Sequence, residues 1–212
     1  MSRAGKSANE VEVKIRIDDA SATRRLLRRN GFRVERRRVF ESNEVYDTPE
    51  SALRANRRLL RLRRTGSQVL LTFKDKPIAG KHKIREEIEL SLSNATAFAE
   101  ILNRLGFQMA FRYEKYRTEF ARQRESGLIL LDETPIGNFL ELEGSPAWID
   151  RTAALLGISE QQYITASYAS LYLAHCAERG IQPAHMVFSD RPASHRIERC
   201  EPMLNSLKPS NG

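Results

Sequence analysis

Cysteine, histidine and long apolar runs are scarce in this 212-residue chain. The two cysteines, Cys176 and Cys200, lack metal-ligand spacing, which disfavours a disulfide framework and a zinc site. The four histidines are scattered, which disfavours a histidine metal centre. No segment approaches the roughly 18 consecutive apolar residues of a membrane span, and residues 1–9 lack the apolar core of a signal peptide. We therefore expect a soluble cytoplasmic protein with no membrane partner.

Positive charge, by contrast, is abundant, since the formal net charge is +8. Such a balance indicates a polyanionic partner, which could be a nucleic acid, a membrane surface or a small polyphosphate. The length suits one folded domain, which we place at residues 1–180. Hydrophobic periodicity is lost beyond Gly180, and proline, serine and charge dominate from residue 191. We expect a disordered tail over residues 181–212.

Most of the folded part alternates apolar and polar residues with the period of two that strands show. The first such segment, residues 10–17, places Glu10, Glu12 and Lys14 on one face and four β-branched residues on the other. In the second segment, residues 36–38 interrupt the alternation, so the sequence does not decide which of its faces points inward. Eight strands are predicted in all, at residues 10–17, 32–47, 57–65, 69–74, 83–92, 108–122, 128–132 and 138–143.

Helical spacing with capping signals separates some of these strands. Glycine follows the first three helical segments, as is typical of a helix C-terminus. Trp148 and Tyr172 are expected to pack their helices on the fold, whereas Tyr168 fits a helix anchor and a tunnel mouth equally well. The predicted helices cover residues 18–30, 93–105, 147–156 and 165–178.

Charged residues fill the strand faces opposite the apolar ones. The charged face of an antiparallel sheet is normally its solvent side, which carries serine, threonine and asparagine among the charges. Here almost every residue on the non-apolar face of several strands is ionisable, which favours a functional site. The collected set contains eight acids and seven bases: Glu10, Glu12, Lys14, Arg61, Arg63, Lys74, Arg85, Glu87, Glu89, Lys115, Arg117, Glu119, Asp132, Glu141 and Glu143.

Eight strands can close into a barrel in which the side chains of one face converge around one small ligand. We therefore predict an α+β fold, a closed eight-stranded antiparallel β-barrel (tunnel) with flanking helices on its apolar outside. Isolated buried charges are costly, so the charges of such an interior must be paired, hydrated or liganded. Carboxylates without histidine or cysteine suit Mg²⁺ or Mn²⁺, and arginine and lysine suit phosphate oxygens. Together they indicate a metal-bound polyphosphate.

The charged motifs of residues 10–173 occur in a definite order: Glu10-x-Glu12-x-Lys14, Tyr46-Asp47-Thr48, Leu60-Arg61-Leu62-Arg63, Lys74, Arg85-x-Glu87-x-Glu89, Lys115-x-Arg117, Asp132, Gly137-x-Phe139-x-Glu141-x-Glu143 and Ser167-Tyr168. This ordered set resembles the CYTH superfamily, the triphosphate tunnel metalloenzymes. That family includes class IV adenylate cyclases, thiamine triphosphatases and inorganic triphosphatases.

The resemblance implies a tunnel in which bases hold a triphosphate and acids hold one or two divalent metals. Glu10, Glu12 and Lys14 would form the catalytic centre. Arg85 and Glu119 fit a supporting ion pair in the wall as well as a direct contact. The implied phosphate ligands are Lys14, Arg61, Arg63, Lys74, Lys115 and Arg117. The acids implied to bind or orient metal are Glu10, Glu12, Glu87, Glu89, Asp132, Glu141 and Glu143.

Three functions fit these residues. Hydrolysis of an inorganic, thiamine or nucleoside triphosphate is favoured over cyclisation of ATP to cyclic AMP and pyrophosphate, because class IV cyclases carry a His-Phe pair where this chain has Ala4-Gly5. A non-catalytic polyphosphate- or nucleic-acid-binding module is disfavoured, since eight carboxylates would repel a polyanion unless metals intervened. A small-molecule triphosphate is therefore the expected partner. The sequence does not decide whether the protein forms a homodimer.

Overall fold

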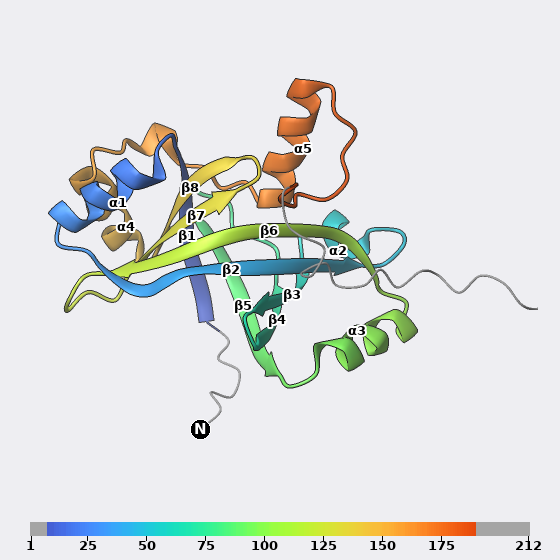
Figure 1. Ribbon diagram of the computed structural model, residues 1–212. Helices are drawn as coiled ribbons and strands as arrows, with labels where there is room; N and C mark the ends of the chain where they lie inside the picture. The colour runs from blue at the N-terminus through green and yellow to red at the C-terminus, as the bar shows by residue number, and fades with distance from the viewer. Residues whose placement is uncertain (1–7, 190–212) are drawn as a thin grey trace, which may run out of the picture.

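The computed structural model describes residues 8–189, whose strands form a barrel with helices on its outside (Figure 1). The strands close in the order β1-β5-β4-β3-β2-β6-β7-β8, and all neighbouring pairs are antiparallel. The predicted α+β fold, a closed eight-stranded antiparallel barrel with flanking helices, is confirmed. The strands are β1 (Ala8–Ile17), β2 (Arg33–Asp47), β3 (Leu59–Thr65), β4 (Gln68–Lys74), β5 (Lys83–Leu92), β6 (Gln108–Ala121), β7 (Leu128–Thr134) and β8 (Gly137–Glu143).

Three of the longer helices begin two or three residues after the expected starts at 18, 93 and 165, because polar residues near those starts are N-caps, whereas α4 begins one residue before the expected 147. The side chains of Asp19, Asn94 and Ser167 each accept hydrogen bonds from backbone N–H groups of the first turn that follows. The helices are α1 (Ala20–Arg29), α2 (Ala52–Ala55), α3 (Ala95–Arg104), α4 (Pro146–Leu155), the 3₁₀ turn η1 (Glu160–Gln162) and α5 (Tyr168–Arg179).

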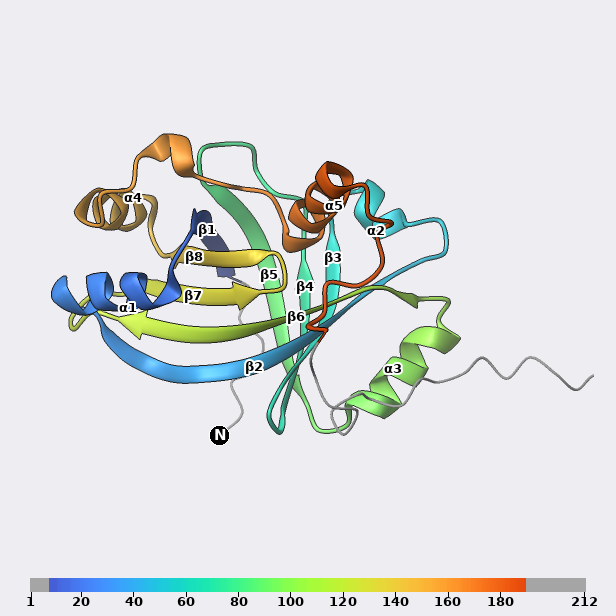
Figure 2. The same ribbon diagram turned by 45° about the horizontal axis from the view of Figure 1, so that its top comes forward.

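The main hydrophobic core lies outside the barrel, between its wall and helices α1 and α4, which both lie beside β7 and β8 (Figures 1 and 2). Val13 and Ile15 of β1 enter it with Leu27 of α1 and Ile149 of α4, and all four are almost fully buried. Trp148 packs there as expected. Because apolar residues face outward and bury against helices, the opposite face of each strand points into the barrel.

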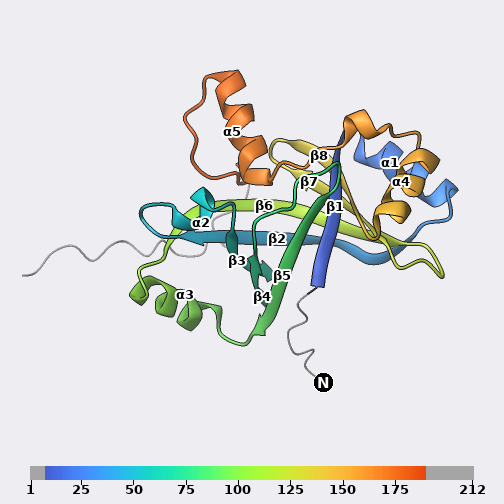
Figure 3. The ribbon, with the colours of Figure 1, turned by 180° about the vertical axis from the view of Figure 1, so that it is seen from behind.

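Strand β1 completes the barrel by pairing with β5 on one side and β8 on the other; from behind, β1 and β5 run side by side (Figure 3). In this register Glu12 lies opposite Lys83 of β5 and Glu143 of β8, and Lys14 lies opposite Glu141. Facing residues of neighbouring strands project to the same side of a sheet. Barrel closure therefore brings charges from both ends of the domain into one interior.

Strand β2 is irregular in the region where residues 36–38 interrupt the alternation. Its pairing with β6 shifts register between Val34 and Arg36, and again between Arg36 and Val39. Beyond these bulges Glu41 lies opposite Lys115, and its side chain is only 1% exposed. Each one-residue shift exchanges the faces of a strand, and the two shifts together restore them. Glu41 points inward because it lies opposite Lys115, on the inner face of β6.

The short helix α2 was not predicted from the sequence. The Asp47 carboxylate organises it by accepting hydrogen bonds from the backbone N–H groups of Thr48, Leu53 and Arg54 at 2.8, 2.8 and 2.9 Å. A carboxylate is well suited to such orphan N–H groups at a helix start. The Tyr46-Asp47-Thr48 motif therefore builds the turn after β2.

Part of the stretch expected to be a disordered tail is ordered against the barrel. The backbone of Met186 bridges to β6, through hydrogen bonds with Arg112 and Glu114 at 3.0 and 2.9 Å, and its side chain is 1% exposed. For residues 181–189 the expectation of disorder is therefore wrong, since an apolar side chain finds a buried site. The rest of the expected tail, residues 190–212, lies outside the described residues. No helix within residues 8–189 combines the length and the apolar character needed to cross a bilayer.

Candidate active site

A cavity of about 970 Å³ fills the barrel interior and is lined mainly by ionisable side chains. Ser167 and Tyr168, at the start of α5, border it, so both roles considered for Tyr168 apply. All fifteen charged positions collected from the strand faces line it except Asp132, and Lys83 joins them. The lining acids are Glu10, Glu12, Glu87, Glu89, Glu119, Glu141 and Glu143, and the bases are Lys14, Arg61, Arg63, Lys74, Lys83, Arg85, Lys115 and Arg117.

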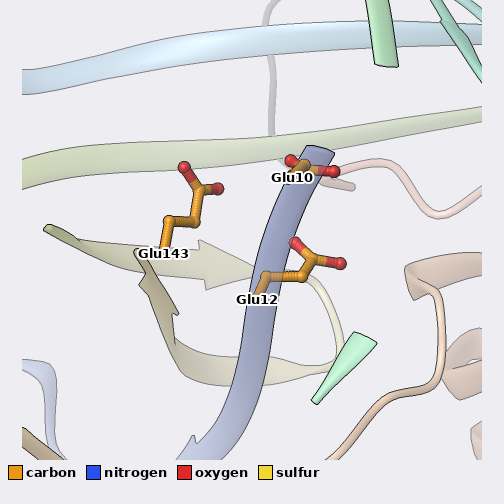
Figure 4. A group of neighbouring side chains, drawn as sticks. All are labelled: Glu10, Glu12 and Glu143. Atoms are coloured by element: carbon orange, nitrogen blue, oxygen red, sulfur yellow. The ribbon is translucent and has the colours of Figure 1, made fainter. Parts of the chain in front are cut away.

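Three of the acids converge. Glu10 and Glu12 of β1 and Glu143 of β8 direct their carboxylates toward one another (Figure 4), with one oxygen of each within 4.8 Å of the others. Lys74 donates a hydrogen bond to Glu10, and Lys83 donates one to Glu12 at 2.5 Å. Glu143 has no hydrogen bond or ion pair to another described side chain.

Glu143 lies in a buried environment with three other carboxylates nearby. Burial, with added repulsion from Glu10, Glu141 and Glu12, raises the pKa of Glu143 to about 8 even though Arg117 opposes the shift. For Glu12, burial also favours a higher pKa, but Lys14 and Lys83 hold it well below the usual value. A hard divalent cation at the three carboxylates would offset the repulsion around Glu143. The donor set therefore fits Mg²⁺ or Mn²⁺, with Glu10, Glu12 and Glu143 as the residues that would hold it.

The other acids expected at the metal are engaged with bases. Glu87 lies 3.2 Å from Lys74, and Glu89 accepts a hydrogen bond from Arg63 at 3.0 Å. Glu141 accepts hydrogen bonds from Lys14, at 2.5 Å, and from Arg117. These carboxylates position the cationic side chains around the cavity.

Asp132 does not itself line the cavity, and it is fully buried among residues that do. It accepts hydrogen bonds from Lys115, Arg117 and Tyr168 at 2.7 Å each, with a second, bidentate contact from Arg117 at 2.7 Å. Burial and the Asp132 charge raise the pKa of Tyr168, which keeps its hydroxyl a donor. Of the two roles expected for Asp132, this geometry fits orientation of neighbouring groups.

Two of the four guanidinium groups that line the cavity, those of Arg61 and Arg85, have no ion pair with a described carboxylate. Arg61 donates at 3.2 Å to the hydroxyls of Tyr113 and Thr72, and its Nε has no partner. The buried Nε of Arg85 also lacks a hydrogen bond. Buried donors are normally satisfied, so these groups have donors that could bind an anion. Glu119, the other residue with two expected roles, lines the cavity and also pairs with Arg36 at 3.5 Å.

Two charged residues in the site were missed in the sequence analysis. Lys83 shares the parity of Arg85, Glu87 and Glu89 along β5, so extending that alternation by one step would have found it. Glu41 lies 3.6 Å from Lys115 and 4.0 Å from Arg63. Glu41 was missed because the interruption at residues 36–38 left undecided which face of this strand points inward.

Similar folds occur in proteins from several organisms. A Methanocaldococcus jannaschii protein provisionally named an adenylate cyclase is 27% identical over 172 residues, covering 76% of this chain and 97% of that protein. A solved structure from Pyrococcus horikoshii is 25% identical with a TM-score of 0.67, covering 78% of this chain and 99% of that one. A Hippeastrum structure, provisionally named an adenylyl cyclase and described as having a dominant triphosphatase activity, is 19% identical with a TM-score of 0.58 and covers 82% and 97%.

Residues 8–168 match the CYTH domain, which is most of the described chain. The matched range begins with β1 and ends at Tyr168, so it contains all eight strands and every charged residue of the cavity. The resemblance inferred from the ordered motifs is confirmed, and the chain belongs to the CYTH family.

Proposed function

We propose that this protein is a divalent-metal-dependent enzyme that hydrolyses a triphosphate bound inside the barrel. The observation that carries the proposal is one cavity in which three carboxylates converge beside eight bases. In this arrangement the carboxylates suit the metal ion of a metal-bound polyphosphate, and the bases suit its phosphate oxygens. The Hippeastrum neighbour with a dominant triphosphatase activity supports hydrolysis as the reaction.

The bases provide the phosphate site. Arg61, with no carboxylate partner, is available for the anion, and Arg63, Lys74 and Lys115 line the same cavity. Lys14 and Arg117 are held by Glu141, which fixes their direction. Phosphoryl transfer depends largely on such positioning and on neutralisation of charge.

The acids provide the metal site, with Glu10, Glu12 and Glu143 as the proposed ligands. A bound Mg²⁺ or Mn²⁺ would neutralise charge on phosphate oxygens and would lower the pKa of a water molecule. Glu87, Glu89, Asp132 and Glu141 are proposed to orient the bases with which they pair. The pairing keeps the cavity organised before substrate enters.

The charge balance of the cavity disfavours a binding module for bare polyanions. Its lining contains eight bases and seven acids, so the site has little excess positive charge with which to hold nucleic acid. A triphosphate that arrives with divalent cations suits this near-neutral interior. A small-molecule triphosphate is therefore the proposed partner.

Cyclisation of ATP is the second candidate, and two observations favour it. The Methanocaldococcus relative is named for that activity, and the cavity also has apolar lining from Leu70, Leu128 and Leu130, which would suit a nucleobase. In this reaction the ribose 3′-hydroxyl would attack the α-phosphorus and release pyrophosphate. The same bases would hold the triphosphate.

The test is to incubate the protein with inorganic triphosphate, thiamine triphosphate and ATP, each with Mg²⁺ or Mn²⁺, and to separate the products. Orthophosphate as the product would support hydrolysis. Cyclic AMP with pyrophosphate would instead support cyclisation and refute hydrolysis as the main reaction. Turnover of none of them would refute both reactions. Glu12→Gln should abolish metal-dependent turnover without unfolding the protein, and Glu100→Gln on the exposed face of α3 is the matched control.

A further inference from the structure

Lys83 is a buried base at the start of β5 that pairs with a proposed metal ligand. Its Nζ lies 2.5 Å from Oε1 of Glu12, and the residue is 9% exposed. In the β1–β5 register it faces Glu12 directly. Lys83 therefore supplies part of the positive charge that keeps Glu12 ionised within the barrel.

A divalent cation at Glu10, Glu12 and Glu143 would itself supply the positive charge that keeps Glu12 ionised. An ammonium and a divalent cation at one carboxylate repel each other, so each weakens the binding of the other. Lys83 has no second carboxylate partner among the described residues, and Lys14 and Arg85 add further repulsion. Its long side chain has the rotational freedom to leave Glu12. Because Lys83 lines the cavity, an anion there can receive it.

We propose that Lys83 is a positioning residue that exchanges partners: it neutralises Glu12 while no divalent cation is bound and turns to the polyphosphate once the cation has bound Glu12. The inference rests on the proposed function for the identity of that anion. Cation binding then frees a phosphate donor, and the anion stabilises the released ammonium. The two ligands bind cooperatively, and the coupling is reciprocal.

Removal of the Lys83 charge should change the two affinities in opposite directions. Lys83→Met deletes the competitor at Glu12, so Mn²⁺ alone should bind about fivefold tighter or more, within the usual range of coupling between sites. The same substitution deletes a charged donor to phosphate. Polyphosphate should bind about tenfold more weakly when Mn²⁺ is saturating.

Two binding measurements test this without turnover. The affinity for Mn²⁺ alone is measured from the free-ion signal in electron paramagnetic resonance titrations. The affinity for imidotriphosphate, a hydrolysis-resistant analogue, is measured at saturating Mn²⁺ from the rise in unfolding temperature. Lys81→Met is the matched control, because Lys81 lies two residues away and forms exposed ion pairs with Asp150 and Glu160. It should leave both affinities unchanged.

Two further variants protect the test against misfolding. Lys83→Arg keeps the charge and should retain wild-type competition with Mn²⁺, and Lys83→Gln replaces Lys83→Met should that variant not fold. Unchanged or weaker Mn²⁺ binding in the neutral variant overturns the exchange, even where triphosphate is hydrolysed. Tighter Mn²⁺ binding with unchanged imidotriphosphate binding also overturns it. If no triphosphate is turned over but the opposite shifts occur, the proposed reaction fails and the exchange stands.

Discussion

Lys14 donates a 2.5 Å hydrogen bond to Glu141, although 127 residues separate them in the chain. Adjacent antiparallel strands bring them together, and both side chains are about 95% buried or more. Burial favours a lower pKa for Lys14, but the charges of Glu141 and Glu12 raise it, so the lysine remains cationic. A buried pair of this kind costs desolvation, and its retention suits a cation that is positioned for a ligand.

Lys14→Met should reduce kcat/KM for the preferred triphosphate by about two to three orders of magnitude, the usual effect of removing a preorganised charge contact. Steady-state kinetics measure this, with circular dichroism to confirm the fold. Lys76→Met, at an exposed position outside the cavity, should retain activity. Equal losses in the two variants would contradict a role for Lys14 in binding phosphate.

Mn²⁺ affinity should rise between pH 6 and pH 8. The pKa of Glu143 in the folded protein is raised to about 8, so below this pH a proton occupies the carboxylate and competes with the metal. Affinity should fall by up to about tenfold for each pH unit below 8 because one proton is displaced. Calorimetric titrations at three pH values measure the slope.

Glu143→Gln is the diagnostic variant for this pH dependence. It should bind Mn²⁺ more weakly, with a slope reduced by the one proton that Glu143 contributes. Glu100→Gln, outside the barrel, should keep the wild-type slope. An unchanged slope in Glu143→Gln would show that another group supplies the proton.

Glu41→Gln should destabilise the protein at neutral pH. Burial favours a higher pKa for Glu41, but Lys115, Arg117 and Arg63 lower it to about 2 from the ordinary 4.5. A depressed carboxylate pKa contributes stability above about pH 4.5 that is lost as the pH falls toward 2, and this shift corresponds to about 3 kcal/mol. Urea unfolding should show a loss of that order at pH 7 and a smaller one near pH 3. A loss independent of pH would refute the electrostatic cause.

Tyr168→Phe should destabilise the folded protein. The variant removes the hydroxyl that donates to Asp132 at 2.7 Å, so a fully buried carboxylate loses one donor while it keeps Lys115 and Arg117. The free energy of unfolding should fall by about 1–3 kcal/mol. Tyr163→Phe is the control, because its 3.3 Å bond to Asp150 lies outside the barrel, and its loss should be smaller. Equal losses of unfolding free energy in the two variants would show that the buried Tyr168–Asp132 hydrogen bond stabilises the protein no more than the Tyr163–Asp150 one.

Local patterns were sufficient to predict the strands, because alternation follows from the geometry of each chain segment. Val11 and Val13 marked the outer face of β1, and Glu10 and Glu12 marked the inner one, before any partner strand was known. The first turn of each helix was less predictable. Asp19 and Ser167 look helical by spacing but serve as N-caps outside their helices.

The partners of each charge depend on closure and register, which no local pattern contains. Glu141 and Glu143 have the same Glu-x-Glu spacing as Glu10 and Glu12, yet Glu143 joins the metal group and Glu141 holds Lys14 and Arg117. Asp132 has the inward parity of a ligand but is enclosed by three donors.

The sequence by itself determined eight alternating strands, a charged interior and the family, because side-chain direction within a strand is set by its own backbone. Only the tertiary structure decided that Glu10, Glu12 and Glu143 converge, that Lys83 contacts Glu12, and that Glu41 faces inward opposite Lys115. Each of these depends on which strands pair and in which register, and that is selected by packing of the whole barrel.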